Sequence, residues 1–214
     1  MQLQAAAFRA EIGGLFMALK LACIFLASGH SKRFRENKLL SNVGGQTLVD
    51  VVFQNHPAEL FNQTIVVTRY APVAVSAAQC GFSVAENEDG TDDISKTIRL
   101  GIEALRPGID GCMFSVCDQP LLTAVSIRKL VQAFQSSPDQ IAVLAYHGKR
   151  GNPVIFPKFL FGELASLPAG QAGSAVIDAH RELLAMVPVE NRRELMDIDY
   201  RSDLDAIVQP ESNP

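Results

Sequence analysis

The sequence predicts an α/β fold, a doubly wound and mostly parallel β-sheet with helices on both faces. Three short segments, residues 21–27, 63–68 and 111–117, are rich in apolar and β-branched residues, as strands buried on both faces of a parallel sheet are. The segments between such strands carry apolar residues at helical spacing, which is the pattern of βαβ units. The 214 residues are 48% hydrophobic and 20% charged, and this composition favours one compact domain.

Local signals define the expected elements. Ser28 and Gly29 end the first strand, Pro72 opens a helix at its first turn, and Thr123 suits a helix N-cap. We expect strands at residues 21–27, 63–68, 82–86, 111–117, 141–146, 153–156 and 186–189. We expect helices at residues 47–55, 72–81, 94–105, 124–135, 159–167, 173–184 and 204–208.

The predicted domain spans residues 20–208 and is followed by a polar tail, residues 209–214. Residues 1–19 are left out of the predicted fold as an N-terminal extension. Arg9 and Glu11 interrupt its apolar residues, where a signal peptide needs an unbroken run. Because Met17 lies just before the first strand, residues 1–16 are either an upstream extension of the protein or an addition to it. No apolar run approaches the roughly 20 residues of a membrane helix.

Charge and cysteine content narrow the class of protein. The net charge of −4, from 19 Lys and Arg against 23 Asp and Glu, argues against nucleic acid or an anionic membrane as the main partner. The four cysteines, Cys23, Cys80, Cys112 and Cys117, form no C-x-x-C pair. They are interpreted as reduced, mostly buried thiols of a cytoplasmic protein.

A basic loop follows the first predicted strand. Lys32, Arg33, Arg35 and Lys38 lie close together behind Ser28-Gly29, where small residues allow backbone amides to approach an anion. In a parallel sheet, ligands bind outside the carboxyl ends of the strands, so the loops after residues 27, 86 and 117 should share one edge. Spacing alone favours a solvated basic loop, but the position directly after the first buried strand makes a phosphate site about equally good; the P-loop pattern does not fit.

The remaining candidate site residues are three aspartates, one asparagine and one arginine. Asp118 ends a buried strand, and beside a polyphosphate it would require a hard cation such as Mg²⁺; its alternative is a turn aspartate before Pro120. Of Asp197 and Asp199, only one can face the ligand edge, because alternate residues of an extended segment point to opposite sides. Asn87 is either a nucleotide contact or a turn residue, and Arg150 either an acceptor contact or an exposed turn residue.

Four motifs, in order along the chain, resemble those of one enzyme family. Residues 26–34 (LASGHSKRF) with Lys38-Leu39-Leu40 resemble L-A-[AG]-G-x-S-x-R-[MF] followed by K-L-L. Residues 117–120 (CDQP) resemble its D-x-P motif, residues 150–156 (RGNPVIF) resemble R-G-x-P-V-x-F, and residues 197–199 (DID) resemble its terminal D-I-D. The family comprises the MobA-like nucleotidyltransferases that attach a nucleotide to molybdopterin, and the match is most similar to the molybdenum cofactor cytidylyltransferase branch.

The resemblance implies a Rossmann-like fold, similar to that of nucleotide-diphospho-sugar transferases, and transfer of a nucleoside monophosphate from an NTP, with CTP favoured, to molybdopterin. The implied nucleotide contacts are Leu26, Ala27, Ser28, Gly29, Arg33, Lys38, Asn87 and Asp118, and Arg33, Lys38 and Asp118 would be catalytic. Asp118 and Asp199, with Asp197 as the alternative, would hold Mg²⁺ or Mn²⁺. Arg150, Asn152 and Pro153 would contact the acceptor. The product would pass to a recipient molybdoenzyme or its chaperone.

The sequence departs from the family pattern at three places. Ser28 is neither the alanine of cytidylyl members nor the glycine of guanylyl members, which leaves GTP as an alternative. Residues 170–175 (GQAGSA) lack the acid and the arginine of G-D-x-G-A-R, which leaves open a different phosphorylated acceptor, such as a sugar phosphate. Residues 200–203 (YRSD) replace T-P-E-D. A non-catalytic protein that carries nucleotide or cofactor is the alternative from another class.

Overall fold

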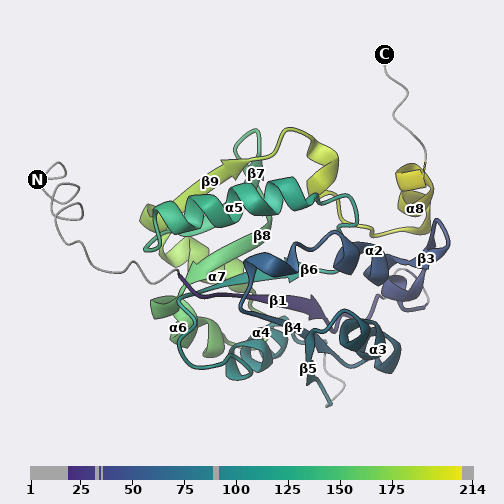
Figure 1. Ribbon diagram of the computed structural model, residues 1–214, viewed down its shortest axis with the longest axis horizontal. Helices are drawn as coiled ribbons and strands as arrows, with labels where there is room; N and C mark the ends of the chain where they lie inside the picture. Colours follow the sequence, from purple (N-terminus) through teal and green to yellow (C-terminus); the bar gives the residue numbers. More distant parts are fainter. Residues whose placement is uncertain (1–18, 32–33, 35, 89–91, 209–214) are drawn as a thin grey trace, which may run out of the picture.

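A seven-stranded sheet forms the centre of the computed structural model, which describes residues 19–31, 34, 36–88 and 92–208 (Figure 1). The strand order is β5-β4-β1-β6-β8-β7-β9, and β8 runs antiparallel to both of its neighbours while the other pairs are parallel. The strands are β1 (Leu21–Ala27), β4 (Gln63–Thr68), β5 (Ser83–Glu86), β6 (Gly111–Val116), β7 (Ile141–Tyr146), β8 (Lys149–Pro157) and β9 (Leu184–Pro188). The predicted fold class, a doubly wound and mostly parallel α/β sheet, is confirmed.

Helices cover both faces of this sheet. They are α2 (Leu48–Gln54), α3 (Ala71–Gln79), α4 (Ile94–Glu103), α5 (Ala124–Ser136), α6 (Phe161–Ala165), α7 (Gly173–Ala179) and α8 (Arg201–Val208). A small hairpin of β2 (Asn42–Val43) and β3 (Gln46–Thr47) precedes α2. Short 3₁₀ helices lie at Lys38–Leu40, Ala58–Leu60, Lys158–Leu160, Arg181–Leu183 and Arg192–Leu195.

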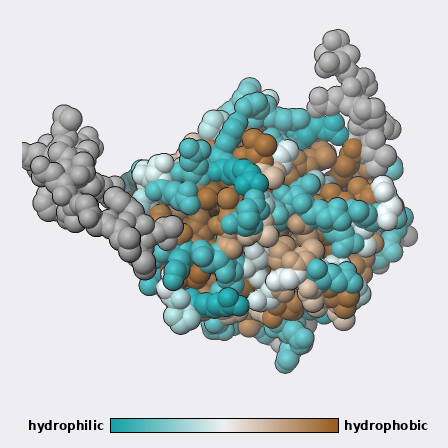
Figure 2. Space-filling view, viewed as in Figure 1, coloured by the Kyte–Doolittle hydropathy of each residue, from teal (hydrophilic) through white to brown (hydrophobic). Residues whose placement is uncertain are grey.

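The alternation of side chains along β1 divides the core into two layers. Cys23 and Phe25 pack with residues of α2, α3 and α5, whereas Ala22 and Ile24 pack with residues of α4, α6 and α7. This is the two-faced burial expected of a central parallel strand. On the face shown in Figure 2, hydrophobic residues lie in several separate groups among hydrophilic ones. In the described part of the chain, no helix is both long and apolar enough to cross a membrane.

Local capping confirms several predicted helix starts. Thr47 and Asp50 form a capping box at α2, Pro72 lies in the first turn of α3, and the Thr123 side chain accepts a hydrogen bond from Ser126 N at α5. These ends were predictable because each depends on residues three or fewer positions away.

Several predicted boundaries in the C-terminal half are wrong. The strand expected at residues 153–156 spans Lys149–Pro157, and the helix expected at residues 204–208 begins at Arg201. The helix expected at residues 173–184 ends at Ala179, and residues 184–188 form β9 instead, parallel to β7. The expected strand at 186–189 is therefore shifted by two residues at its start. The helix expected at 159–167 is a 3₁₀ turn followed by the short α6. Leu183 and Leu184 continue a helical apolar pattern, but pairing with β7 at the sheet edge overrides it.

Candidate active site

A cavity of about 460 Å³ opens at the carboxyl edge of the sheet. Since β1, β4, β5 and β6 are parallel neighbours, their carboxyl ends meet at this edge, as expected. Leu26 pairs with Val116 across β1 and β6, which places the loops after these two strands side by side. The predicted nucleotide contacts Leu26, Ala27, Ser28 and Gly29 all line the cavity.

Hydrogen bonds between side chains and backbone hold the loop after β1 in shape. The buried hydroxyl of Ser28 donates to Val67 O at 3.1 Å, and Tyr70 Oη donates to Gly29 O at 2.8 Å. Ser31 adopts a left-handed conformation with φ of 50°, and its hydroxyl accepts from Lys38 N at 3.2 Å. The loop therefore folds back so that Lys38 returns to the cavity that Gly29 lines.

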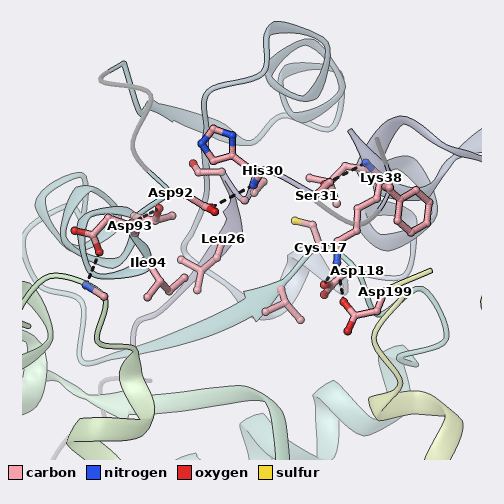
Figure 3. Close-up of a pocket in the computed structure, with 18 residues that line it drawn as sticks. Leu26, His30, Ser31, Lys38, Asp92, Asp93, Ile94, Cys117, Asp118 and Asp199 are labelled. Atoms are coloured by element: carbon pink, nitrogen blue, oxygen red, sulfur yellow. Dashed lines mark hydrogen bonds and ion pairs between the residues drawn. The ribbon is translucent and has the colours of Figure 1, made fainter. Parts of the chain in front are cut away.

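Lys38 joins two carboxylates at one end of the cavity (Figure 3). Its Nζ lies 2.6 Å from Asp118 Oδ2 and 3.7 Å from Asp199 Oδ1, and it donates to Ile198 O at 3.0 Å. The side chains of Lys38 and Asp118 are only 16% and 19% exposed. Three residues predicted as site residues, from segments up to 161 positions apart, thus meet at one point.

Of the two aspartates Asp197 and Asp199, the fold brings Asp199 to the cavity. Ile198 is fully buried between them, and its N donates to Asp118 O at 2.9 Å, which fixes the segment beside the end of β6. Asp199 lines the cavity. Asp197 instead accepts from Gln119 Nε2 at 2.7 Å, and burial together with the neighbouring Asp118 carboxylate raises its pKa.

The carboxylates fit a divalent ion that arrives with phosphate. Mg²⁺ in phosphoryl-transfer sites is held by one or two carboxylates together with substrate oxygens. Asp118 Oδ1 is buried and has no hydrogen-bond partner among the described residues, which leaves a carboxylate oxygen that a cation could satisfy. No group of three or more His, Cys, Asp or Glu that could hold a metal occurs in the described ranges.

Two aspartates line the opposite end of the cavity, and sequence reasoning missed them (Figure 3). Asp92 Oδ1 accepts from His30 N at 3.3 Å. Asp93 caps α4 by accepting from Ser95 N and also accepts from Gly170 N, both at 3.0 Å. Hydrogen bonds from Gly170 and Ser95 lower the pKa of Asp93. Consecutive aspartates before a helix are a signal that could have identified the cap.

A second pocket, of about 410 Å³, adjoins the first. The two share Leu26, Ile94 and Val116 as lining residues. The walls of the second pocket are mainly apolar, and it is lined further by Ile98, Phe114, Arg150, Gly151, Asn152, Val154, Phe156, Leu164, Ala172, Gly173, Ser174 and Ile177. Of the residues predicted to contact the acceptor, Arg150 and Asn152 line it, whereas Pro153 is buried and does not. Arg150 Nη2 pairs with Asp178 Oδ1 at 3.1 Å.

Of the predicted nucleotide contacts, one is not among the described residues and another is not among the residues that line the cavity. Arg33 falls outside the described residues, as do Lys32 and Arg35. Asn87 directly follows β5 and is only 1% exposed, and it does not line the cavity. Neither polar atom of its side chain has a hydrogen-bond partner within the described part of the chain.

The sequence profile of the MobA-like NTP transferase domain matches residues 23–184, which is more than half of the chain. The chain belongs to this family. It is therefore a nucleotidyltransferase of the MobA-like type, as the motif resemblance implied. The MobA-like domain is 23% identical over 195 residues to the purine catabolism protein PucB of Bacillus subtilis, a match that covers 86% of this chain and 94% of PucB.

Solved structures share the fold of this MobA-like domain. Rv0371c of Mycobacterium tuberculosis matches 90% of this chain and 99% of its own, with a TM-score of 0.76 and 23% identity, and it has also been solved in complex with manganese. A nucleotidyl transferase of Methanothermobacter matches 88% and 95%, with a TM-score of 0.74 and 19% identity. A CMP:2-keto-3-deoxy-manno-octonic acid synthetase complexed with CTP matches 88% and 97%, with a TM-score of 0.69 and 11% identity.

Proposed function

We propose that this MobA-like domain transfers a nucleoside monophosphate from an NTP, with CTP favoured, to the phosphate of a molybdopterin-type cofactor, and releases pyrophosphate. The observation that carries the proposal is that Lys38, Asp118 and Asp199 meet at one end of the cavity, which the loop after β1 also lines. One lysine and two carboxylates at this place suit a metal-bound triphosphate.

In this proposal the nucleotide occupies the larger cavity. Small residues at Ser28 and Gly29 let backbone amides approach the phosphates, and Lys38 supplies a mobile positive charge. Arg33, which belongs to the same loop, would contact the β- and γ-phosphates. Asn87 stays a proposed contact to the ribose or base. Its amide is buried without partners among the described residues, which a ligand could satisfy, but it does not line the cavity, so the nucleotide would have to reach past the cavity wall.

The reaction needs positioning and charge neutralisation more than a protein nucleophile. A phosphate oxygen of the acceptor attacks the α-phosphorus, the bond from the α-phosphorus to the bridging oxygen breaks, and pyrophosphate leaves. Asp118 and Asp199 would hold the divalent ion, Mg²⁺ or Mn²⁺, which when bound neutralises charge on the phosphates. Lys38 would orient the α-phosphate. Because the second pocket shares a wall with the first, an acceptor bound there lies next to the reacting phosphate.

A different phosphorylated acceptor is the second candidate, and a specific observation favours it. The segment that departs from the family pattern, residues 170–175, contributes Ala172, Gly173 and Ser174 to the second pocket. Gln171 and Ala175, which stand in place of the acid and the arginine of the family motif, flank these three residues in the sequence. A protein that carries nucleotide without turnover is disfavoured by the paired carboxylates, which a carrier would not need.

The test measures pyrophosphate release. The protein is mixed with Mg²⁺, molybdopterin-bound molybdenum and each of CTP, GTP, ATP and UTP in turn, and release is expected to be fastest with CTP. Asp118→Asn and Asp199→Asn should each reduce turnover by on the order of 10²–10³-fold, as loss of a key electrostatic group does. Asp197→Asn is the matched control and should cost less than about tenfold, because its carboxylate does not line the cavity.

Each outcome separates the candidates. Release that requires a sugar phosphate in place of molybdopterin would favour the second candidate. Tight nucleotide binding without release would indicate a carrier. No release with any of the four nucleotides and either acceptor would refute nucleotidyl transfer as proposed.

A further inference from the structure

We infer that the Lys38 ammonium and a divalent cation compete for the same two carboxylates, so that the protein binds the ion weakly until a nucleotide draws the lysine away. This inference deepens the proposed function and rests on its assignment of Asp118 and Asp199 as the metal ligands. It makes metal binding dependent on nucleotide binding. A protein regulated in this way takes up the ion together with the triphosphate.

The oxygens around the ammonium are those that a hard cation would use. Lys38 Nζ lies 2.6 Å from Asp118 Oδ2, 3.0 Å from Ile198 O and 3.7 Å from Asp199 Oδ1. Carboxylate and backbone carbonyl oxygens are also the ligands that hard divalent cations accept. The ammonium thus already contacts both of the carboxylates that would hold the ion.

Charge balance makes the two cations alternatives. The ammonium carries one positive charge and a divalent ion two, and both would draw on the same pair of carboxylates. A divalent ion bound to both carboxylates would be repelled by an ammonium only a few ångströms away, and partial burial of Lys38 and Asp118 reduces the screening of that repulsion. Binding of the ion therefore favours departure of the lysine, and the lysine opposes binding of the ion.

The lysine can leave without rearrangement of the loop. Its backbone is fixed, because Lys38 N donates to Ser31 Oγ at 3.2 Å and Asn37 caps the 3₁₀ helix that begins at Lys38. Its four-carbon side chain is flexible, and a phosphate oxygen offers the ammonium a partner as strong as a carboxylate. A triphosphate in the cavity would thus release Asp118 and Asp199 for the metal.

The test is Mn²⁺ binding without nucleotide, measured by electron paramagnetic resonance or calorimetry. Lys38→Met keeps an unbranched apolar side chain and removes the charge, and it should bind Mn²⁺ at least tenfold more tightly than the unchanged protein. Lys38→Gln, a second neutral variant, should show the same direction. Adding Asp118→Asn to Lys38→Met should abolish the gain, because it removes a ligand for which the two cations compete.

The matched control is Lys129→Met. It removes the same charge from an exposed ion pair, that of Lys129 with Glu190 at 2.8 Å, and should leave Mn²⁺ affinity within twofold of the unchanged protein. Unchanged or weaker Mn²⁺ binding in both Lys38 variants would overturn the inference. The readout is independent of turnover: a protein that releases pyrophosphate but shows no gain keeps the proposed function and loses the competition. A protein that shows the gain in Mn²⁺ affinity but releases no pyrophosphate keeps the competition and loses the proposed function.

Discussion

Buried polar atoms without hydrogen-bond partners mark individual residues of this protein. Among the described residues they include Asp118 Oδ1, both polar atoms of the Asn87 side chain and His56 Nδ1. Such atoms are uncommon in native proteins and call for a physical reason. Asp118 lines the cavity, where a bound nucleotide and metal would supply a partner, and Asn87 directly follows β5 at the same edge of the sheet. His56 lies in the core, stacked on Phe61 with ring centroids 4.8 Å apart. The missing hydrogen bond of its Nδ1 therefore lowers the free energy of unfolding.

Protonation of His56 should destabilise the protein in acid. Burial lowers its pKa to about 4, although the nearby Glu59 acts in the opposite direction. In the unfolded state, where the pKa of His56 is about 6.5, the imidazole binds a proton more readily than in the folded state. The stability conferred by neutral His56 is therefore present above pH 6.5 and is lost as the pH falls from about 6.5 toward 4. Between pH 7 and 5 this group should remove about 2 kcal/mol from the free energy of unfolding, measured by urea denaturation.

The control for this prediction is His56→Gln, which cannot titrate and can still donate to Thr64 Oγ1, the present partner of His56 Nε2. Its free energy of unfolding should fall about 2 kcal/mol less than that of the unchanged protein over the same pH range. Equal pH dependence in both proteins would show that His56 is not the titrating group.

At the scale of elements, helix α4 lies unusually close to the central strand. A Cβ at Gly101 would lie 2.6 Å from Ile24 Cγ2, and Ile24 is fully buried. The close approach matters for the site, because the same helix is capped by Asp93 and carries Ile94 and Thr97, which line the cavity. Glycine at position 101 therefore helps to set the position of that cavity wall.

Gly101→Ala should destabilise the protein by about 1–3 kcal/mol, because overpacking of a tightly packed core forces side chains or backbone to move. Gly162→Ala in α6 is the matched control. It is also a helical glycine, but a Cβ there meets nothing within 4 Å, so the change should be neutral or slightly stabilising. Chemical denaturation compares the two variants, and equal effects would contradict the packing explanation.

The whole molecule works as a frame that brings distant segments to one edge. The loop after β1, the end of β6 and the segment before α8 all contribute to the cavity, and Asp118 O binds Ile198 N directly. A ligand that contacts all three segments would bind the folded state and not the unfolded chain. Ligand binding should therefore stabilise the molecule as a unit.

Saturating CTP with Mg²⁺ should raise the melting temperature. At a ligand concentration 100-fold above its dissociation constant, the expected gain is about 2.7 kcal/mol. For a domain of this size that corresponds to roughly 5–10 °C. Calorimetric melting with each of the four nucleotides measures this. A larger shift with GTP than with CTP would contradict the proposed base preference, and Asp118→Asn should lose the part of the shift that depends on Mg²⁺.

The amino-acid sequence determined the central strands, the fold class and the motif residues Lys38, Asp118 and Asp199, because apolar runs, capping residues and motifs are local patterns. Tertiary structure decided the rest. Only the burial of Ile198 and its hydrogen bond to Asp118 O show that Asp199 and not Asp197 lines the cavity, and only the pairing with β7 shows that residues 184–188 form a strand and not the end of a helix. The physical reason is that strand pairing and burial join residues far apart in the chain, and these contacts override local preference.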